Sequence, residues 1–184
     1  DAGITADISA QCDTRVIWGG DQTVRSIRAV PLPVHATELT FPDRFSLAAI
    51  GADAYRAMTD TSRDELAVHF YNDAFVFDQL ACSSPRLLVW VGDPGDAAQD
   101  FFDRVGKVTA DRGYGVDASA AIAKLSEAYS AMIDLPVKSY RREGNTVTVL
   151  SVEDFPHVRG AFCGAGFFFQ MQVRSLLDLV PHIR

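Results

Sequence analysis

The sequence is poor in the residues that mark several classes of protein. Its three cysteines, Cys12, Cys82 and Cys163, are far apart, and no Cys-x-x-Cys pair or cluster of cysteine with histidine occurs. Such a sparse, odd set is unlike the disulfide framework of a small secreted domain, and it offers no spacing typical of zinc ligands. We therefore expect no metal site, and we expect a reducing compartment, the cytoplasm.

Long apolar runs and an excess of basic residues are also missing. No run of 18 apolar residues occurs, so we expect no membrane span. The formal net charge is −7, which argues against electrostatic attraction to nucleic acid or to anionic membrane surfaces. Hydrophobic residues make up 48% of the chain and charged residues 22%, a balance typical of a globular protein with a substantial core.

Apolar periodicity predicts strands and helices that alternate along most of the chain. Strands are expected at 15–18, 45–50, 87–91, 137–142, 146–152 and 166–173; helices are expected at 21–29, 64–77, 96–112 and 176–179, and from Asp117 or Ser119 up to Pro136, the last with Ile122, Leu125, Tyr129 and Met132 as its apolar face. Several strands are apolar throughout, which is typical of a parallel or mixed sheet covered on both faces. The sequence therefore predicts an α/β fold, with a domain boundary near residue 40.

One cysteine stands in a short turn between a helix and a strand. Cys82 begins the segment Cys-Ser-Ser-Pro, after a helical pattern that ends at Phe77 and before the strand at 87–91. A thiol at such a junction is fixed by rigid elements and is still open to a substrate. Backbone N–H groups of the turn can stabilise a thiolate and bind an oxyanion. Cys82 is therefore a candidate nucleophile, although a free cysteine is more commonly a buried, inert thiol.

Three further features are weaker candidates. Gly19 and Gly20 follow a strand and precede Asp21, which can cap the next helix, so this turn can bind the phosphate of a cofactor or can be a tight turn without a ligand. Glu38 has apolar neighbours and can be a general base with a raised pKa or a solvated strand residue. The segment 163–166, Cys-Gly-Ala-Gly, predicts a tight bend that admits a ligand or leads into a core strand.

Four segments in this order resemble a known family. They are 16–21 (Val-Ile-Trp-Gly-Gly-Asp), 38–44 (Glu-Leu-Thr-Phe-Pro-Asp-Arg), 77–86 (Phe-Asp-Gln-Leu-Ala-Cys-Ser-Ser-Pro-Arg) and 163–167 (Cys-Gly-Ala-Gly-Phe). The chain is similar to the long-chain acyl-coenzyme A reductases of the bacterial bioluminescence type, within the aldehyde dehydrogenase superfamily. The resemblance runs over nearly the whole chain, and the segment around Cys82 is its specific part.

The resemblance implies an aldehyde-dehydrogenase-like catalytic domain over residues 41–184, and the C-terminal part of a Rossmann-like cofactor-binding domain over residues 1–40. It implies that NADPH reduces a fatty acyl group, donated by coenzyme A or by a protein, to a fatty aldehyde. Cys82 matches the family's nucleophile, one place later than in ordinary aldehyde dehydrogenases, and Glu38 matches their general base. Gln79 matches the motif's glutamine. The oligomeric state stays open, a homo-oligomer included.

Two other readings stay open. In a non-acylating aldehyde dehydrogenase, Glu38 would activate water against the thioester. In a non-catalytic scaffold domain with the same fold, Cys82 would be buried and no cofactor would bind. Because chains of the family are longer, the resemblance also implies that the first cofactor-binding strands lie upstream of Asp1, and we expect the 184-residue chain alone to show no turnover.

Overall fold

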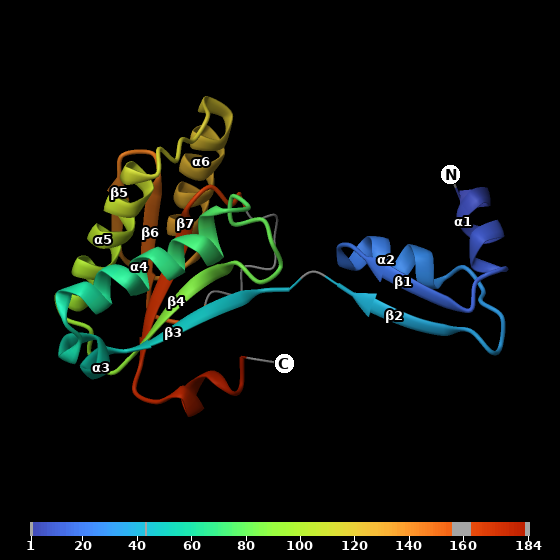
Figure 1. Cartoon of the computed structure of the whole chain (residues 1–184), viewed down its shortest axis with the longest axis horizontal. Helices are drawn as coiled ribbons and strands as arrows, with labels where there is room; N and C mark the ends of the chain where they lie inside the picture. Colours follow the sequence, from blue (N-terminus) through green and yellow to red (C-terminus); the bar gives the residue numbers. More distant parts are fainter. Residues whose placement is uncertain (1, 43, 156–162, 183–184) are drawn as a thin grey trace. The chain divides into compact units, whose positions relative to one another are not determined.

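The chain forms two compact units in the computed structural model, which describes residues 2–42, 44–155 and 163–182 (Figure 1). The units are Asp1–Arg44 and Phe45–Arg184. The division therefore lies between residues 44 and 45, whereas the sequence places the boundary near residue 40. The cofactor-binding and catalytic roles assigned to the two parts remain predictions.

The first unit is built around a pair of parallel strands. It contains α1 (Ala2–Ser9), β1 (Thr14–Trp18), α2 (Asp21–Arg28) and β2 (Thr37–Phe41). The strands β1 and β2 pair in parallel, and α2 lies in the connection between them, so the three elements form a β–α–β unit. Ile17 of β1 and Val24 of α2 are buried, whereas Trp18 is exposed and stacks on Phe41 with ring centroids 4.7 Å apart.

The second unit is a five-stranded sheet with helices. Its elements are β3 (Ser46–Gly51), α3 (Ala52–Ala57), α4 (Asp60–Phe75), β4 (Pro85–Val91), α5 (Ala97–Asp111), α6 (Ala118–Asp134), β5 (Val137–Glu143), β6 (Val147–Val152), β7 (Phe167–Val173) and the 3-10 helix η1 (Leu176–Leu179). The strand order is β3-β4-β7-β6-β5. All neighbours in this order are parallel except β5, which pairs antiparallel with β6 at one edge. The predicted α/β fold with a mostly parallel sheet is confirmed.

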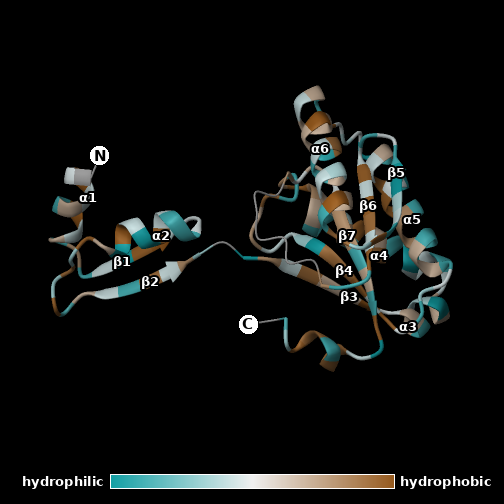
Figure 2. Ribbon diagram, turned by 180° about the vertical axis from the view of Figure 1, so that it is seen from behind, coloured by the Kyte–Doolittle hydropathy of each residue, from teal (hydrophilic) through white to brown (hydrophobic). Residues whose placement is uncertain are grey.

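Each face of this sheet carries a buried core. Successive side chains of a strand point to opposite sides, so one strand contributes to both cores. In β4, Leu88 and Trp90 join a core cluster with residues of α3, α4 and α5, whereas Leu87 and Val89 join a second cluster with residues of α6 and η1. All four side chains are at most 1% exposed. The uninterrupted apolar run of β4 is explained by these two cores, and Figure 2 shows the hydrophobic strands between the helices.

Side-chain caps begin two of the helices that cover the sheet. The Thr59 hydroxyl accepts a hydrogen bond from the Ser62 N–H at the start of α4, and the Asp117 carboxylate accepts one from the Ala120 N–H at the start of α6. The sequence places the start of α4 near Asp64 and does not predict α3. The first turn of α4 is polar and α3 has six residues, so neither shows an apolar repeat.

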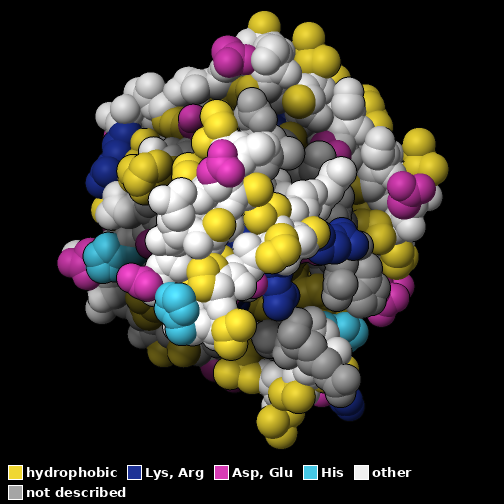
Figure 3. Space-filling view, turned by 90° about the vertical axis from the view of Figure 1, so that its right-hand side faces the viewer, with side chains coloured by type: hydrophobic (Ala, Val, Ile, Leu, Met, Phe, Trp, Pro, Cys, Tyr) yellow, Lys and Arg dark blue, Asp and Glu magenta, His cyan; other side chains and the backbone are white. Residues whose placement is uncertain are grey.

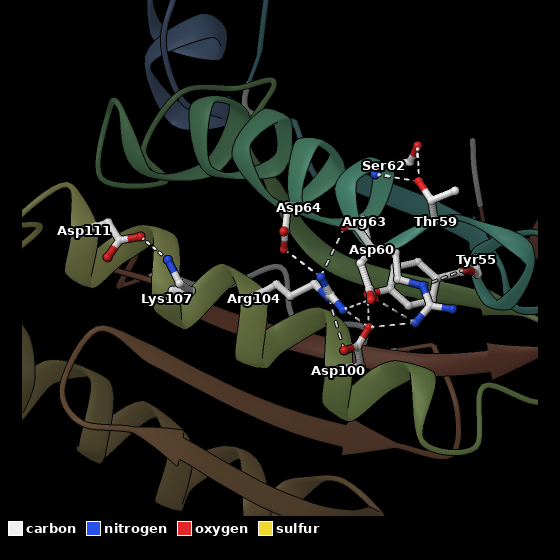
Figure 4. Close-up of polar contacts among 10 residues, drawn as sticks. All are labelled: Tyr55, Thr59, Asp60, Ser62, Arg63, Asp64, Asp100, Arg104, Lys107 and Asp111. Carbon is white, nitrogen blue, oxygen red and sulfur yellow. Dashed lines mark hydrogen bonds and ion pairs between the residues drawn. The ribbon is translucent and has the colours of Figure 1, made fainter.

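A charged network joins α4 to α5 (Figure 4). The Arg104 guanidinium donates hydrogen bonds of 2.6–3.1 Å to the carboxylates of Asp60, Asp64 and Asp100. The Tyr55 hydroxyl of α3 donates to Asp100 at 2.7 Å, and burial together with this bond raises the pKa of Tyr55. Burial alone would raise the pKa of Asp100, but the bonds from Arg104 and Tyr55 outweigh it, so this pKa is lowered. The network therefore fixes the two helices as charged partners over the sheet.

Candidate active site around Cys82

Cys82 lies at the end of the sheet where the parallel strands begin, that is, at their N-termini. Its turn connects α4 to β4, and the Ser46 hydroxyl at the start of β3 donates a 2.7 Å hydrogen bond to the Cys82 carbonyl. The segment that leads into β7 lies at the same end of the sheet, because β7 is parallel to β4. The Cys82 residue is exposed. Its thiol is therefore within reach of a substrate, as a nucleophile requires.

A buried amide anchors the first half of the turn. Gln79 is 0% exposed. Its side-chain NH2 donates hydrogen bonds to the carbonyls of Pro85 at 2.9 Å and Phe167 at 2.8 Å, and its carbonyl oxygen accepts one from the Gly166 N–H at 3.1 Å. One side chain thus ties the turn to the beginnings of β4 and β7. The sequence offers Gln79 only as a motif match, and its burial is the signal that reveals a role.

A buried hydroxyl anchors the second half of the turn. Ser84 is 1% exposed, and its Oγ donates a 2.7 Å hydrogen bond to the Asp73 carbonyl of α4. The Ser84 N–H donates to the Ala81 carbonyl at 3.0 Å, so this amide is engaged within the turn. The exposed thiol therefore stands on a backbone that is tied on both sides, which preorganises it for attack.

The glycine-rich segment before β7 is the tight bend that the sequence predicts. Gly164, Ala165 and Gly166 all have positive φ, at 65°, 54° and 77°. A Cβ on Gly166 would lie 2.0 Å from the Thr146 carbonyl oxygen, and one on Gly164 would lie 2.4 Å from the Asp78 carbonyl oxygen. The close approach is to the chain's own backbone. The bend therefore leads into a core strand.

Cys163, beside this bend, differs from Cys82 in its surroundings. It is only partly exposed, and burial, with the negative charge of Glu127, raises the pKa of its thiol to about 11. A thiol with that pKa stays protonated at neutral pH, and the thiolate is the nucleophilic form. Of the two cysteines in the second unit, Cys82 is the better candidate.

The glycine turn of the first unit leaves the start of α2 open. Gly20 is the N-cap residue of α2, no side chain caps the helix, and a Cβ added to Gly20 would meet nothing within 4 Å. Free space before uncapped helical N–H groups fits a phosphate group of a cofactor. The expectation that Asp21 caps the helix is wrong, because the extended backbone of Gly20 takes the cap position and Asp21 is the first helical residue.

Glu38 is held by two arginines of its own unit. The Arg15 Nε donates to Glu38 Oε2 at 2.8 Å, and the Arg28 Nε lies 2.9 Å from Oε1. The hydrogen bond from Arg15 is the main cause that lowers the pKa of Glu38; burial opposes it and is outweighed. Of the two alternatives that the sequence leaves open for Glu38, the general base with a raised pKa is therefore not found. The neighbouring Leu39 alternates to the other face of β2, so the apolar sequence neighbours do not surround the carboxylate.

The predicted site residues fall into two groups. Gly19, Gly20, Asp21 and Glu38 belong to the first unit, and Cys82 belongs to the second. Their assembly into one site remains a proposal. Among the described residues, no group of three or more histidine, cysteine or acidic side chains is placed to hold a metal ion. Within the same residues, no helix has the length and apolar character that a membrane crossing needs.

A separate pocket of about 470 Å³ lies at the opposite end of the sheet, beyond the C-termini of β3 and β4. Its lining includes Tyr55, Arg56, Arg63 and Asp100. Its arginines are already engaged: Arg56 donates to the Asp93 carbonyl at 2.6 Å, and Arg63 donates to the Tyr55 carbonyl at 3.2 Å. The pocket is thus remote from the Cys82 turn in the sheet topology, and both of its arginines bond neighbouring groups of the same unit.

The sequence profile of the acyl-CoA reductase (LuxC) family matches residues 1–112, which is more than half of the chain. The chain belongs to this family. The matched region includes the Cys82 turn, and the family resemblance predicted from the sequence is confirmed. No curated protein matches the chain.

Solved structures related to this LuxC-family chain have the aldehyde dehydrogenase fold. It is similar to proline utilization A from Bradyrhizobium japonicum (TM-score 0.63, 16% identity, 98% of this chain and 19% of that chain). It is also similar to an NADP-dependent glyceraldehyde-3-phosphate dehydrogenase from Bacillus halodurans (0.61, 14%, 97% and 39%) and to a 1-pyrroline-5-carboxylate dehydrogenase from Thermus (0.58, 13%, 91% and 35%). At these identities the likeness shows the fold alone, and the chain spans 19–39% of the length of these proteins.

Proposed function

We propose that the full-length protein is an oxidoreductase that reduces a fatty acyl thioester to a fatty aldehyde, with Cys82 as the nucleophile. The observation that supports this most strongly is the exposed Cys82 on a turn that Gln79 and Ser84 tie from both sides. The family match covers this turn. The acyl donor is fatty acyl-coenzyme A or an acylated protein, since both present the same thioester.

The chemistry suits a cysteine. The Cys82 thiolate attacks the acyl carbonyl carbon, the carbon–sulfur bond to the donor breaks, and the donor thiolate leaves and takes up a proton. One thioester replaces another, so this exchange is close to thermoneutral. The acyl group on Cys82 remains electrophilic enough to accept a hydride at its carbonyl carbon. Collapse of the resulting tetrahedral anion breaks the bond to Cys82, releases the aldehyde and restores the thiolate.

The proposed reduction needs a nicotinamide cofactor, for which we propose NADPH. When bound, it supplies the hydride. We assign its binding to Gly19, Gly20 and Asp21, because the open, uncapped start of α2 fits a phosphate group. Two of the similar structures contain NADP and NAD.

The pairing of Glu38 favours reduction over hydrolysis. Each carboxylate oxygen faces an arginine, Oε2 with Arg15 and Oε1 with Arg28. A carboxylate in two ion pairs with a lowered pKa is a poor proton acceptor, so it would activate water weakly. In this proposal Glu38 stabilises the first unit and does not activate water to release the acyl group as a fatty acid.

Product analysis tests the proposal. The full-length protein is supplied with a fatty acyl-coenzyme A and either NADPH or NADH, and aldehyde and free coenzyme A are quantified. We expect the two products in equal amounts, with NADPH the better reductant. The same protein is then given the aldehyde and oxidised cofactor without coenzyme A. Rapid formation of fatty acid there, with no reduction in the first assay, would show a non-acylating aldehyde dehydrogenase instead.

A further inference from the structure

Two backbone segments with positive φ angles meet at the end of the sheet that carries Cys82. Asp78, Gln79 and Ala165 are the three non-glycine residues with positive φ in the part of the chain that the structure describes. All three lie at one contact: the Ala165 N–H donates a 2.9 Å hydrogen bond to the Asp78 carbonyl, and the Gly166 N–H donates to the Gln79 side chain at 3.1 Å. Strained backbone persists only where its surroundings hold it, and it concentrates at functional sites.

A buried ammonium group supports this contact from the other side. Lys124 of α6 is 3% exposed, and its Nζ donates hydrogen bonds to the Ala165 carbonyl at 2.8 Å and to the Asn145 carbonyl at 2.6 Å. Neither of these partners is charged, although burying an ammonium group is costly. Burial lowers the pKa of Lys124 to about 8, and the positive charge of Arg142 lowers it further. We therefore expect a buried ammonium group to be kept where its hydrogen bonds hold a backbone geometry that the protein needs.

We propose that Lys124 is a positioning residue for Cys82, which it serves by fixing the bend at Ala165. The inference rests on the proposed role of Cys82 as the nucleophile. The connection runs through hydrogen bonds: Lys124 holds the Ala165 carbonyl, and the Ala165 N–H holds the Asp78 carbonyl. Asp78 lies in the turn that carries Cys82, and the Ser46 hydroxyl of β3 donates a hydrogen bond to the Cys82 carbonyl. Removing the ammonium group frees one side of the turn while its other ties remain.

Substitution of Lys124 in the full-length protein tests the inference. Lys124→Met keeps the length and the apolar stem but removes the donors; Lys124→Arg keeps the charge and the donors. Lys138→Met is the matched control, because Lys138 is 61% exposed and lies 3.6 Å from Glu153. The first measurement is hydrogen exchange of the Leu80 and Ser84 amides, which bond within the turn.

The expected result is local. In Lys124→Met these turn amides exchange about tenfold faster, while amides in the middle of β4 change by less than about twofold. The rate at which fatty acyl-coenzyme A acylates Cys82 falls about tenfold at saturating substrate with little change in KM, because a misplaced nucleophile affects the chemical step. Lys124→Arg recovers part of both effects, and Lys138→Met behaves as wild type. Should Lys124→Met fail to fold, Lys124→Gln replaces it in the comparison.

Two results would overturn the inference. One is turn amides that exchange at the wild-type rate, or that change no more than those of β4, since Lys124 would then contribute only to general stability. The other is faster turn exchange with an unchanged acylation rate, since the sulfur would then need no support from Lys124. If wild-type Cys82 is not acylated at all, the proposed function fails, and the exchange comparison still decides whether Lys124 holds the turn.

Discussion

At the residue scale, the glycine before β7 has a fixed structural role. Gly166 has a φ of 77°, and a Cβ there would overlap the Thr146 carbonyl oxygen at 2.0 Å. Gly113 has a similar φ of 65° but nothing within 4 Å of an added Cβ, so it isolates the cost of the backbone angle. We expect Gly113→Ala to lower the free energy of unfolding by about 1 kcal/mol and Gly166→Ala by at least about 3 kcal/mol.

Urea unfolding followed by tryptophan fluorescence measures both changes, because Trp90 is 1% exposed in the core of the second unit, whereas Trp18 of the first unit is already 71% exposed. Equal losses in the two variants would contradict the contact at Gly166.

Lys124 predicts a pH dependence of stability. Its pKa is lowered to about 8 in the folded protein, against about 10.4 for an unperturbed lysine. Between these values the unfolded chain binds more protons, so the free energy of unfolding rises with pH. The raised pKa of Cys163 acts in the opposite direction above its ordinary value, because the unfolded thiol ionises first. The contribution of Lys124 is therefore clearest between about pH 7.5 and 9.

Over this window we expect wild type to gain about 1 kcal/mol relative to Lys124→Met. The measurement is urea unfolding of both proteins at several pH values. Parallel stability curves for the two proteins would show that Lys124 titrates normally and is not desolvated.

At the element scale, the pairing of α4 with α5 depends on Arg104. This side chain is 18% exposed and bonds acidic groups on both helices, so Arg104→Met removes the cation nearest to Asp60, Asp64 and Asp100. Arg63, 3.6 Å from Asp100 and 4.0 Å from Asp60, stays in the network. We expect the free energy of unfolding to fall by about 1–2 kcal/mol. Lys107→Met is the control on the same helix, because its pair with Asp111 is exposed and lies within one helix.

Urea unfolding at low and high salt checks this prediction. A loss in Lys107→Met as large as that in Arg104→Met would contradict a specific role for the network between the helices.

The elements themselves are predictable from the sequence wherever apolar period and length agree. The strands at 87–91 and 166–173 and the helix at 96–112 are found within a few residues of their expected bounds. The face of α6 is not predictable in this way. Its expected apolar face is largely exposed, with Ile122 at 66% and Tyr129 at 56%, whereas Ala128 and Ala131 are buried. Periodicity finds the largest apolar residues, but the contact with the sheet uses small ones.

The candidate site divides in the same way. The sequence selects Cys82, since a lone thiol in a helix-to-strand turn is a local signal. It does not reveal Lys124, whose partners lie on a distant hairpin and bend, or the pairing of Glu38 with Arg15, which are far apart in the sequence. These contacts exist only once the strands are in register, so they depend on tertiary structure.

At the scale of the whole molecule, apolar side chains reach the surface as well as the two cores. Figure 3 shows hydrophobic groups among acidic and basic ones on the face that it presents. In the first unit, Trp18 is 71% exposed and Val16 55% exposed on the face of β1 opposite the buried Ile17. Because the chain spans 19–39% of the similar structures, its activity belongs to the full-length protein in our proposal.

Catalytic turnover and the reactivity of the Cys82 thiol can be tested separately with the 184-residue chain alone. We expect no NADPH-dependent reduction by it, but we expect Cys82 to react with iodoacetamide, because the described contacts that hold the turn all lie within the second unit. Peptide mass spectrometry after a short exposure measures the labelling, with Cys163 as the half-buried comparison. Faster labelling of Cys163 than of Cys82 would contradict the accessibility described for the two thiols.

The most direct test is to trap the acyl-enzyme. Full-length protein is incubated with labelled fatty acyl-coenzyme A in the absence of reductant, digested, and the labelled peptide sequenced. The account predicts a thioester on Cys82, full retention of the label in Cys12→Ala, its loss in Cys82→Ala, and its discharge as aldehyde when NADPH is added. Label that persists in the Cys82→Ala protein, or that never forms on wild-type Cys82 although acyl-coenzyme A is reduced, would contradict the account.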